Sequence, residues 1–261
     1  MLGRFLFVFL LVFGTAFQAK DSYRRVVNNS FDAGEYFEYR VRYGLFSAAD
    51  ATVEVSPQVQ YVNNRPCYQV NVVGKTLGAF SWFAKIRDQW TSWIDTSAIV
   101  SQKFYRNIRE NDYKKNETIV FDHAQDNAVV MDENGHKTYD VPNNVQDVIS
   151  GYFFLRTIDF SKVAVGELIN VPAFFENATY PMRIRYRGKD VVRTKFGKIN
   201  VLRLNPILPN NELFKEDESI RIWVSDDFNK VPVKVEVDLA VGSIVMEVKN
   251  YRNIRQEFKW F

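Results

Sequence analysis

Residues 231–239 read Val-Pro-Val-Lys-Val-Glu-Val-Asp-Leu, so valine alternates with mostly charged residues over most of the stretch. Side chains of a β-strand point alternately to the two faces of a sheet, and this pattern therefore predicts one dry face and one wet face. Residues 240–242, Ala-Val-Gly, supply a turn, after which Ile244, Met246 and Val248 continue the alternation in a partner strand. A sheet with one face in water is typical of antiparallel pairing.

The same alternation recurs along the chain. In residues 37–43, Phe-Glu-Tyr-Arg-Val-Arg-Tyr, the odd positions are apolar and the even positions are charged. The sequence therefore predicts a mainly β protein with a large curved antiparallel sheet, either a half-barrel or two fused β halves, and one or two helices packed on it. Further strands are predicted at residues 49–55, 68–72 and 182–186, the last followed by a hairpin at 187–190, and a hairpin around Asn134-Gly135 is predicted between 128–131 and 137–139.

One segment has a clear helical pattern. Asn143 or Asn144, after Pro142, is expected to cap its start, and the helix is expected to end near Asp159. Gly151 costs the helix about 1 kcal/mol relative to alanine, so we expect packing against the concave side of the sheet to hold it. A second short helix is predicted at residues 78–84. The apolar positions with helical spacing are Val145, Val148, Ile149, Tyr152 and Leu155.

The N-terminus has the pattern of a secretory signal peptide over residues 1–19. Arg4 is followed by an apolar run at residues 5–13 and then by the small residues of 14–16. The run is shorter than the roughly 20 apolar residues that a membrane span needs, although a retained anchor is the alternative. Cleavage is expected after Ala16 or Ala19, and the protein is expected to be periplasmic or secreted, with no transmembrane segment after signal removal.

Composition limits the classes of partner. The chain has 34 Lys and Arg against 31 Asp and Glu, with a net charge of +3, so we expect no nucleic-acid partner. Cys67 is the only cysteine, which leaves no intrachain disulfide, and it is interpreted as a small strand residue. No linker rich in Gly, Ser or Pro divides residues 20–261, which are predicted to form a single β-rich domain.

The pentapeptide Tyr-Arg-Asn-Ile-Arg occurs twice, at residues 105–109 and 251–255. A Trp-x-Ser stands upstream of each copy, at Trp90 and at Trp223. Two halves, about 31–120 and 175–261, that arose by duplication would explain this order of matches. Chance similarity between polar strands is the alternative.

Several segments spread over the chain combine into a family resemblance. They are Phe31-Asp-Ala-Gly-Glu35, Val145-Gln-Asp-Val-Ile-Ser150, Tyr152-Phe-Phe-Leu-Arg156, Thr194-Lys-Phe-Gly197, Ile222-Trp-Val-Ser-Asp-Asp227, Val231-Pro-Val233 and Gly242-Ser-Ile244. Together they resemble the exported bacterial proteins grouped as domain of unknown function 3108, with Val248 as a departure where leucine is expected. The resemblance implies an exported protein similar in form to the half-barrels of lipoprotein-localisation factors. It transfers no catalytic residues.

No catalytic or metal-binding motif occurs in the sequence. His123 and His136 lie in a polar, turn-rich region and are interpreted as solvated loop residues. Asp226 and Asp227 could form a pair of glycosidase carboxylates, but their place between two alternating strands favours a turn held by side chain to backbone bonds. The protein is therefore predicted to be non-catalytic, without cofactor or metal.

Aromatic residues cluster in a short part of the chain. Aromatic rings suit both a packed core and a concave site for lipid or sugar. We expect a hydrophobic or amphipathic ligand of the cell envelope, such as a lipid or a lipoprotein segment, to bind against them. The alternative is a carbohydrate-binding or polysaccharide-export accessory protein with exposed tryptophans as stacking platforms. The candidate site residues are Phe80, Trp82, Phe83, Trp90 and Trp93.

Overall fold

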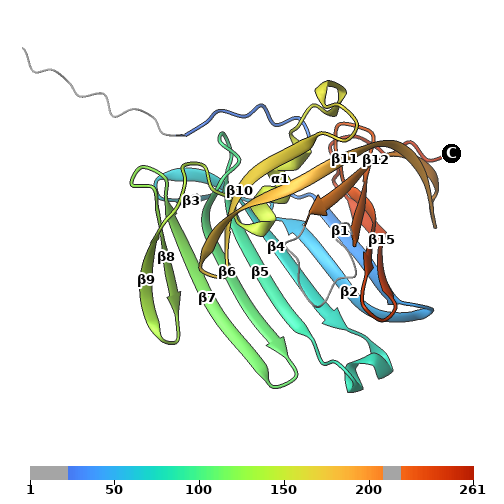
Figure 1. Ribbon diagram of the computed structural model, residues 1–261, viewed down its shortest axis with the longest axis horizontal. Helices are drawn as coiled ribbons and strands as arrows, with labels where there is room; N and C mark the ends of the chain where they lie inside the picture. The colour runs from blue at the N-terminus through green and yellow to red at the C-terminus, as the bar shows by residue number, and fades with distance from the viewer. Residues whose placement is uncertain (1–22, 208–218) are drawn as a thin grey trace, which may run out of the picture.

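Fifteen strands pair into one antiparallel sheet in the computed structural model, which describes residues 23–207 and 219–261 (Figure 1). The strand segments predicted above fall in eight of these fifteen strands. In chain order they are β1 Tyr36–Tyr43, β2 Phe46–Val55, β3 Gln60–Val62, β4 Arg65–Thr76, β5 Arg87–Asp95, β6 Ser101–Glu110, β7 Tyr113–Asp122, β8 Asn127–Asp132, β9 Gly135–Asp140, β10 Leu168–Phe175, β11 Ala178–Thr194, β12 Gly197–Ile207, β13 Ile220–Ser225, β14 Pro232–Asp238 and β15 Ser243–Arg252.

The chain begins in the middle of the sheet. From β1 the strands follow one another to the edge strand β9, with the short β3 paired only to β4. The chain then crosses to the opposite edge, β10, and returns strand by strand to β15, which pairs with β1. Among the described residues the edges β9 and β10 are not hydrogen-bonded to each other, so the sheet remains open. The predicted half-barrel with a curved antiparallel sheet is confirmed.

The crossing connection contains helix α1, Val148–Arg156, which lies inside the curve of the sheet (Figure 1). Ile149 and Phe153 are buried in a hydrophobic core that α1 shares with the first half of the sheet. The predicted helix packed on the concave side is therefore present. It covers the inner face of β4 to β6, and its other side faces β11 to β13.

Both ends of α1 differ from the prediction. The N-cap is Asp147, whose carboxylate accepts the backbone N–H groups of Ile149 and Ser150. Neither predicted cap begins the helix: Asn144 has φ 57°, outside the extended region that a cap occupies, and Asn143 donates its amide to the carbonyl of His123. At the other end, α1 stops at Arg156 rather than near Asp159, which instead caps the 3₁₀ turn η2, Phe160–Lys162.

Gly151 lies where α1 approaches β11. A Cβ atom at this position would lie 2.7 Å from the terminal methyl of Met182. The absence of a side chain therefore allows the helix to come close to the strand, which explains why a residue that weakens a helix stands in its middle.

The predicted hairpin at residues 187–190 is wrong. β11 continues through this segment and pairs with β12 on both sides of an irregularity between Tyr186 and Lys189. Gly188, with φ 89°, supplies the left-handed conformation that a bulge uses. The predicted hairpins β8–β9 and β14–β15 are confirmed, and a 3₁₀ helix, η1 Gly78–Trp82, occupies the segment where a short helix was expected.

The interior consists of three hydrophobic clusters. One lies between α1 and the first half of the sheet, one joins β1 and β15 to the C-terminal tail, and one lies beneath η2 against β11 and β12. Their central residues are Phe31, Val70, Phe104, Phe121 and Phe153 in the first, Phe37, Tyr39, Val233, Val248 and Phe258 in the second, and Phe160, Ile184 and Leu204 in the third.

The two Tyr-Arg-Asn-Ile-Arg copies have different surroundings. Residues 105–109 lie within β6, where Arg106 is buried and bonded to Glu117. The second copy ends β15, and its Arg252 is exposed, 3.6 Å above the ring of Tyr36. Duplication of the halves stays a prediction.

The histidines and the cysteine have contrasting environments. His123 is buried, with Nε2 2.8 Å from the carbonyl oxygen of Ser101, and burial lowers its pKa. The prediction of a solvated loop residue is wrong for His123. His136 is exposed as predicted, but it lies in strand β9 rather than in a loop. Cys67 is buried in β4, as its interpretation as a strand residue requires, and burial raises its pKa to about 12.

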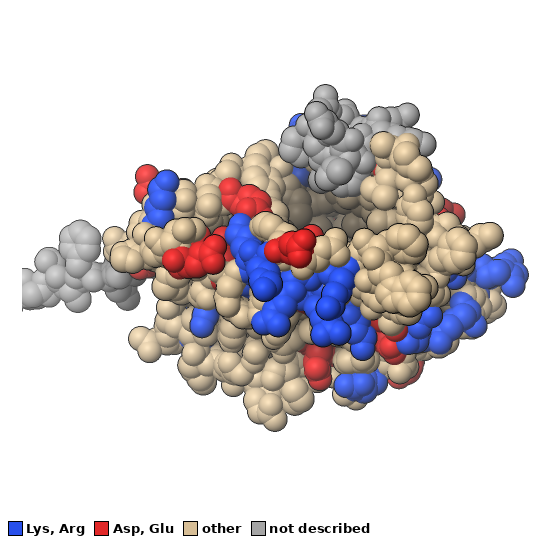
Figure 2. Space-filling view, turned by 90° about the horizontal axis from the view of Figure 1, so that it is seen from below, with Lys and Arg blue, Asp and Glu red and all other residues tan. Residues whose placement is uncertain are grey.

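The predicted signal peptide, residues 1–19, lies outside the described residues. Within 23–207 and 219–261, no helix has both the length and the apolarity to cross a bilayer. On the surface seen from below, Lys and Arg side chains gather in a band, and the molecule is hollowed beside it (Figure 2).

Candidate ligand-binding site

An apolar cavity of about 200 Å³ lies between α1 and the inner face of β11 to β13. The cavity separates part of α1 from these strands, so the side of α1 that does not face the first half of the sheet is incompletely covered. The cavity walls are almost entirely hydrocarbon, because the inward positions of these strands alternate with polar outward ones. Principal contributors are Tyr152 and Leu155 from α1, Met182 and Ile184 from β11, Leu204 from β12 and Ile222 from β13.

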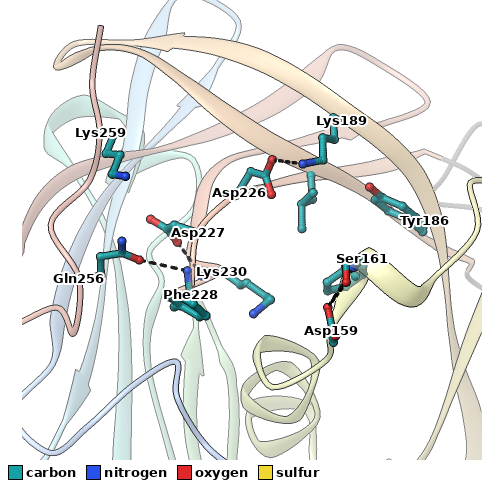
Figure 3. A pocket seen from close by; sticks show the side chains of 12 residues that line it. Asp159, Ser161, Tyr186, Lys189, Asp226, Asp227, Phe228, Lys230, Gln256 and Lys259 are labelled. Atoms are coloured by element: carbon teal, nitrogen blue, oxygen red, sulfur yellow. Dashed lines mark hydrogen bonds and ion pairs between the residues drawn. The ribbon is translucent and has the colours of Figure 1, made fainter.

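A more polar cavity of about 420 Å³ adjoins it and shares Phe160 and Lys230 with it (Figure 3). Asp226 forms an ion pair of 2.7 Å with Lys189 across this cavity. Lys259 reaches it from the C-terminal tail without an ion pair in the described part of the chain. Three lysines and three aspartates therefore line the polar cavity beside the apolar space.

The turn that follows β13 is built around Asp227. Its carboxylate accepts the hydroxyl of Ser225 at 2.7 Å and the backbone N–H groups of Asn229 and Lys230 at 2.9 and 3.1 Å. The predicted turn at Asp226-Asp227, held by bonds from its carboxylate to nearby backbone groups, is confirmed. This turn fixes the backbone of Lys230, which has φ 47°.

Lys230 stands at the junction of the two cavities. Its side chain points into the space between Phe228 and Asp159 (Figure 3). Within residues 23–207 and 219–261, its ammonium has neither a hydrogen bond nor an ion pair. Burial lowers the pKa of Lys230, and the carboxylates of Asp227 and Asp159 only partly oppose this effect. An anion placed beside this ammonium would supply the missing counter-charge.

A buried ion pair anchors the wall of the apolar cavity. Arg156, the last residue of α1, bonds both carboxylate oxygens of Glu35, at 2.5 and 2.7 Å, and each side chain is 1% exposed. Its Nε donates to the carbonyl of Asn229 at 2.8 Å, and Nη2 donates to that of Ser30 at 3.1 Å. Burial opposes the charge of Arg156, but Glu35 outweighs burial and raises the pKa. The end of α1 is thereby attached to the turn that carries Lys230.

A second ionic cluster holds the β10–β11 hairpin over the first half of the sheet. The buried guanidinium of Arg106 bonds Glu117 at 2.8 Å and Glu176 at 2.5 Å, and Lys115 bonds Glu176 at 2.8 Å. Arg106 and Lys115 lower the pKa of Glu176 to about 2. The contact brings Phe174 and Phe175, at the end of β10, onto the inner face of the first half.

The five aromatic residues predicted as a site are separated by the fold. Trp90 faces inward and stacks on Phe175 with 5.9 Å between ring centroids. Trp93 lies on the opposite face, where its Nε1 donates to Gln60 at 3.0 Å. Phe80, Trp82 and Phe83 lie at η1, with Trp82 87% and Phe83 82% exposed, and none of the five lines the two cavities.

Sequence reasoning missed the cavity, because its walls come from segments far apart in the chain. The sequence does contain a partial signal for the surroundings of the cavity. Glu35, Arg156 and the 222–227 segment all belong to the segments that carry the family resemblance, and the structure brings Glu35 and Arg156 together beside the turn after β13.

Comparison with known proteins agrees with this architecture. The family model described as "Protein of unknown function (DUF3108)" matches residues 38–249. A β-barrel-like protein of domain of unknown function DUF1849 from Brucella abortus is similar in structure, with a TM-score of 0.54 and 10% identity over 85% of this chain and 99% of that one. This likeness shows the fold alone.

A putative exported protein with a YmcC-like fold from Bacteroides fragilis is more distantly similar, with a TM-score of 0.35 and 9% identity over 88% of this chain and 100% of that one. Comparison with the curated proteins finds no significant match.

Proposed function

The chain belongs to the DUF3108 family of proteins of unknown function, and we propose that it is an exported, non-catalytic binding protein for an amphipathic component of the cell envelope. The apolar part of the ligand, such as an acyl chain, lies between α1 and β11 to β13. The anionic group of the ligand lies against Lys230, in the polar cavity.

The position of Lys230 carries this proposal. Its ammonium is half-buried and forms no ion pair among the described residues, and burial lowers its pKa although Asp227, Asp159 and Asp226 oppose this effect. Apolar walls begin directly beside it, at Phe160 and Val224. A molecule with an anionic group next to a hydrocarbon chain matches both features at once.

Cavity size limits the class of ligand. The apolar cavity, at about 200 Å³, is smaller than the roughly 300 to 1,000 Å³ of sites for drug-sized molecules, whereas its polar neighbour of about 420 Å³ lies within that range. A single chain with a compact head group therefore fits better than a polycyclic molecule. Cavities with hydrocarbon walls stay dry and accept apolar guests, which supports a chain rather than a sugar in the inner space.

A carbohydrate ligand is less well supported. Sugar platforms need an aromatic face that is open to solvent, but Trp90 is stacked on Phe175 and the ammonium of Lys103 lies 4.8 Å above the ring of Trp93. Of the three tryptophans considered for this role, only Trp82 is exposed.

Binding of a fluorescent fatty acid to the protein purified after export tests the proposal. Lys230→Gln removes the counter-charge and is expected to weaken binding by about tenfold, as loss of one desolvated charge pair would. Lys162→Gln is the matched control, because Lys162 is exposed and lies outside both cavities.

A second variant tests whether the apolar cavity holds the hydrocarbon chain of the ligand. Ile222→Trp fills the inner space and is expected to abolish binding of long chains, while circular dichroism and melting temperature report that the sheet is intact. Native mass spectrometry and lipid extraction of the purified protein show whether an acyl compound is retained. A protein that retains no lipid and binds the fatty acid equally well in all three variants would contradict the proposal.

A further inference from the structure

Three neighbouring turns expose large apolar side chains along one edge of the molecule. We call this edge the apolar rim. It comprises Leu45 and Phe46 at the β1–β2 turn, Trp82 and Phe83 at η1, and Val241 at the β14–β15 turn, which are 96, 73, 87, 82 and 78% exposed.

Hydrogen bonds and ring contacts bring the three turns together. Tyr43, at the end of β1, donates its hydroxyl to the carbonyl of Val241 at 3.0 Å, and its ring lies 6.3 Å from that of Phe80 in η1. The backbone N–H of Leu77 donates to the carbonyl of Ala48 at 2.9 Å, which ties η1 to β2. In Figure 1 these turns lie at the lower right edge of the sheet. The exposed side chains thus form one rim rather than isolated surface residues.

We expect the apolar rim to contact a binding partner. Single exposed apolar residues are ordinary, whereas a continuous group of them marks an interaction surface. The rim consists of the β1–β2 turn, η1 and the β14–β15 turn, which are short connections rather than the face of a sheet. Protruding Trp and Phe side chains suit insertion into the interface of a lipid bilayer, where amphipathic aromatic rings concentrate.

Cations flank the rim. Lys75 and Arg87 face each other across β4 and β5, and Lys85 follows η1. All three are exposed, and none forms an ion pair with a residue that the structure describes. Asp50 and Asp238 are bonded to Arg40 and to Arg221. Two further carboxylates lie beside these cations: Asp88 follows Arg87 in β5, and Glu110 pairs with Ile86. Figure 2 shows Lys and Arg side chains, with some Asp and Glu among them, across the face seen from below.

We infer that the apolar rim docks on an anionic phospholipid membrane, with Trp82, Phe83, Leu45 and Phe46 inserted among the lipid head groups and Lys75, Lys85 and Arg87 against the lipid phosphates. Apolar insertion and attraction to anionic lipid act together in such peripheral binding. None of these residues lines the two cavities. The membrane-docking inference can therefore be tested independently of the proposed ligand binding.

Vesicle flotation of the exported, purified protein tests the inference, with vesicles of phosphatidylcholine alone or mixed with phosphatidylglycerol. The protein is expected to float with the mixed vesicles, to bind neutral vesicles several-fold less, and to detach as salt is added. Tryptophan emission is expected to shift to shorter wavelength on binding, because Trp82 leaves water.

Variants identify the surface. Trp82→Ser/Phe83→Ser is expected to lower the vesicle partition coefficient about tenfold or more, given the apolar area that two rings bury. Tyr61→Ser is the matched control, since Tyr61 is 75% exposed near the opposite end of β4. Lys85→Gln is expected to weaken binding to mixed vesicles several-fold, whereas Arg25→Gln, an exposed cation near the β5–β6 turn, leaves it unchanged. No flotation at low salt, or equal flotation of the double variant and wild type, would overturn the inference.

Discussion

Glu35→Gln tests whether the buried Glu35–Arg156 pair anchors the fold around the candidate site. The substitution keeps the shape of the side chain but removes its charge, and it leaves the guanidinium of Arg156 at 1% exposure facing a neutral amide. The two bonds of 2.5 and 2.7 Å lose their ionic character, while the bonds from Arg156 to the carbonyls of Asn229 and Ser30 remain.

The expected cost is large. Removing one partner of a buried ion pair typically costs about 3 to 5 kcal/mol, because the remaining charge stays desolvated. In a domain of this size each kcal/mol lowers the melting temperature by about 2 to 4 °C, so a decrease of roughly 6 to 20 °C is expected. Glu35→Leu/Arg156→Met removes both charges and is expected to cost clearly less than the sum of its two single substitutions.

Thermal and urea unfolding measure these differences. Glu38→Gln is the matched control, because Glu38 bonds Lys249 at 2.5 Å on a partly exposed part of the sheet, where an ion pair contributes less than about 1 kcal/mol. Equal losses for Glu35→Gln and Glu38→Gln, or additive losses in the double variant, would refute the reasoning that the buried pair is a coupled anchor.

Three further predictions concern single residues. The affinity for a fatty-acid anion is expected to fall as pH rises through the lowered pKa of Lys230, beginning below the pKa of 10.5 of an ordinary lysine. Fluorescence titrations over a pH series measure this affinity. Lys230→Arg should extend binding to higher pH, because a guanidinium stays charged. Asp147→Ala removes the acceptor for Ile149, Ser150 and the hydroxyl of Ser92, so urea unfolding should show a loss of at least about 1 to 2 kcal/mol, and a loss below 0.5 kcal/mol would contradict the capping role. Cys67, with its pKa raised to about 12, should react with a thiol reagent at pH 8 only after denaturation; fast labelling of the native protein would show that the strand opens.

The alternating strands could be predicted from sequence, because a period of two residues depends only on which face of the sheet is dry. Where the prediction fails, contacts with residues distant in the sequence determine the local structure. Residues 187–190 have the composition of a turn, but both flanks of the segment pair with β12, and the chain therefore bulges and continues. His123 was placed in solvent because its neighbours are polar, although it continues the inward alternation of Ile119 and Phe121 beyond the end of β7.

The candidate site was not predictable in the same way. The aromatic segment at 80–93 drew attention because its residues are close in sequence, yet strand alternation sends Trp90 and Trp93 to opposite faces and η1 carries Trp82 out to the rim. The cavity, in contrast, combines side chains from α1, β11, β12 and β13. Their meeting depends on the crossing of the chain from β9 to β10, which no local pattern encodes.

The cavity arises because one short helix, α1, packs against two different parts of the curved sheet. α1 has nine residues, about 14 Å, and its Ile149 and Phe153 are committed to the first half. On the other side, Gly151 permits close contact with Met182 of β11, and Arg156 holds the end of the helix to Glu35 and Asn229. Between these two contacts, the space beside Tyr152 and Leu155 stays open. The proposed ligand, an amphipathic anion, would place hydrocarbon in this space and its negative group beside the unpaired ammonium of Lys230.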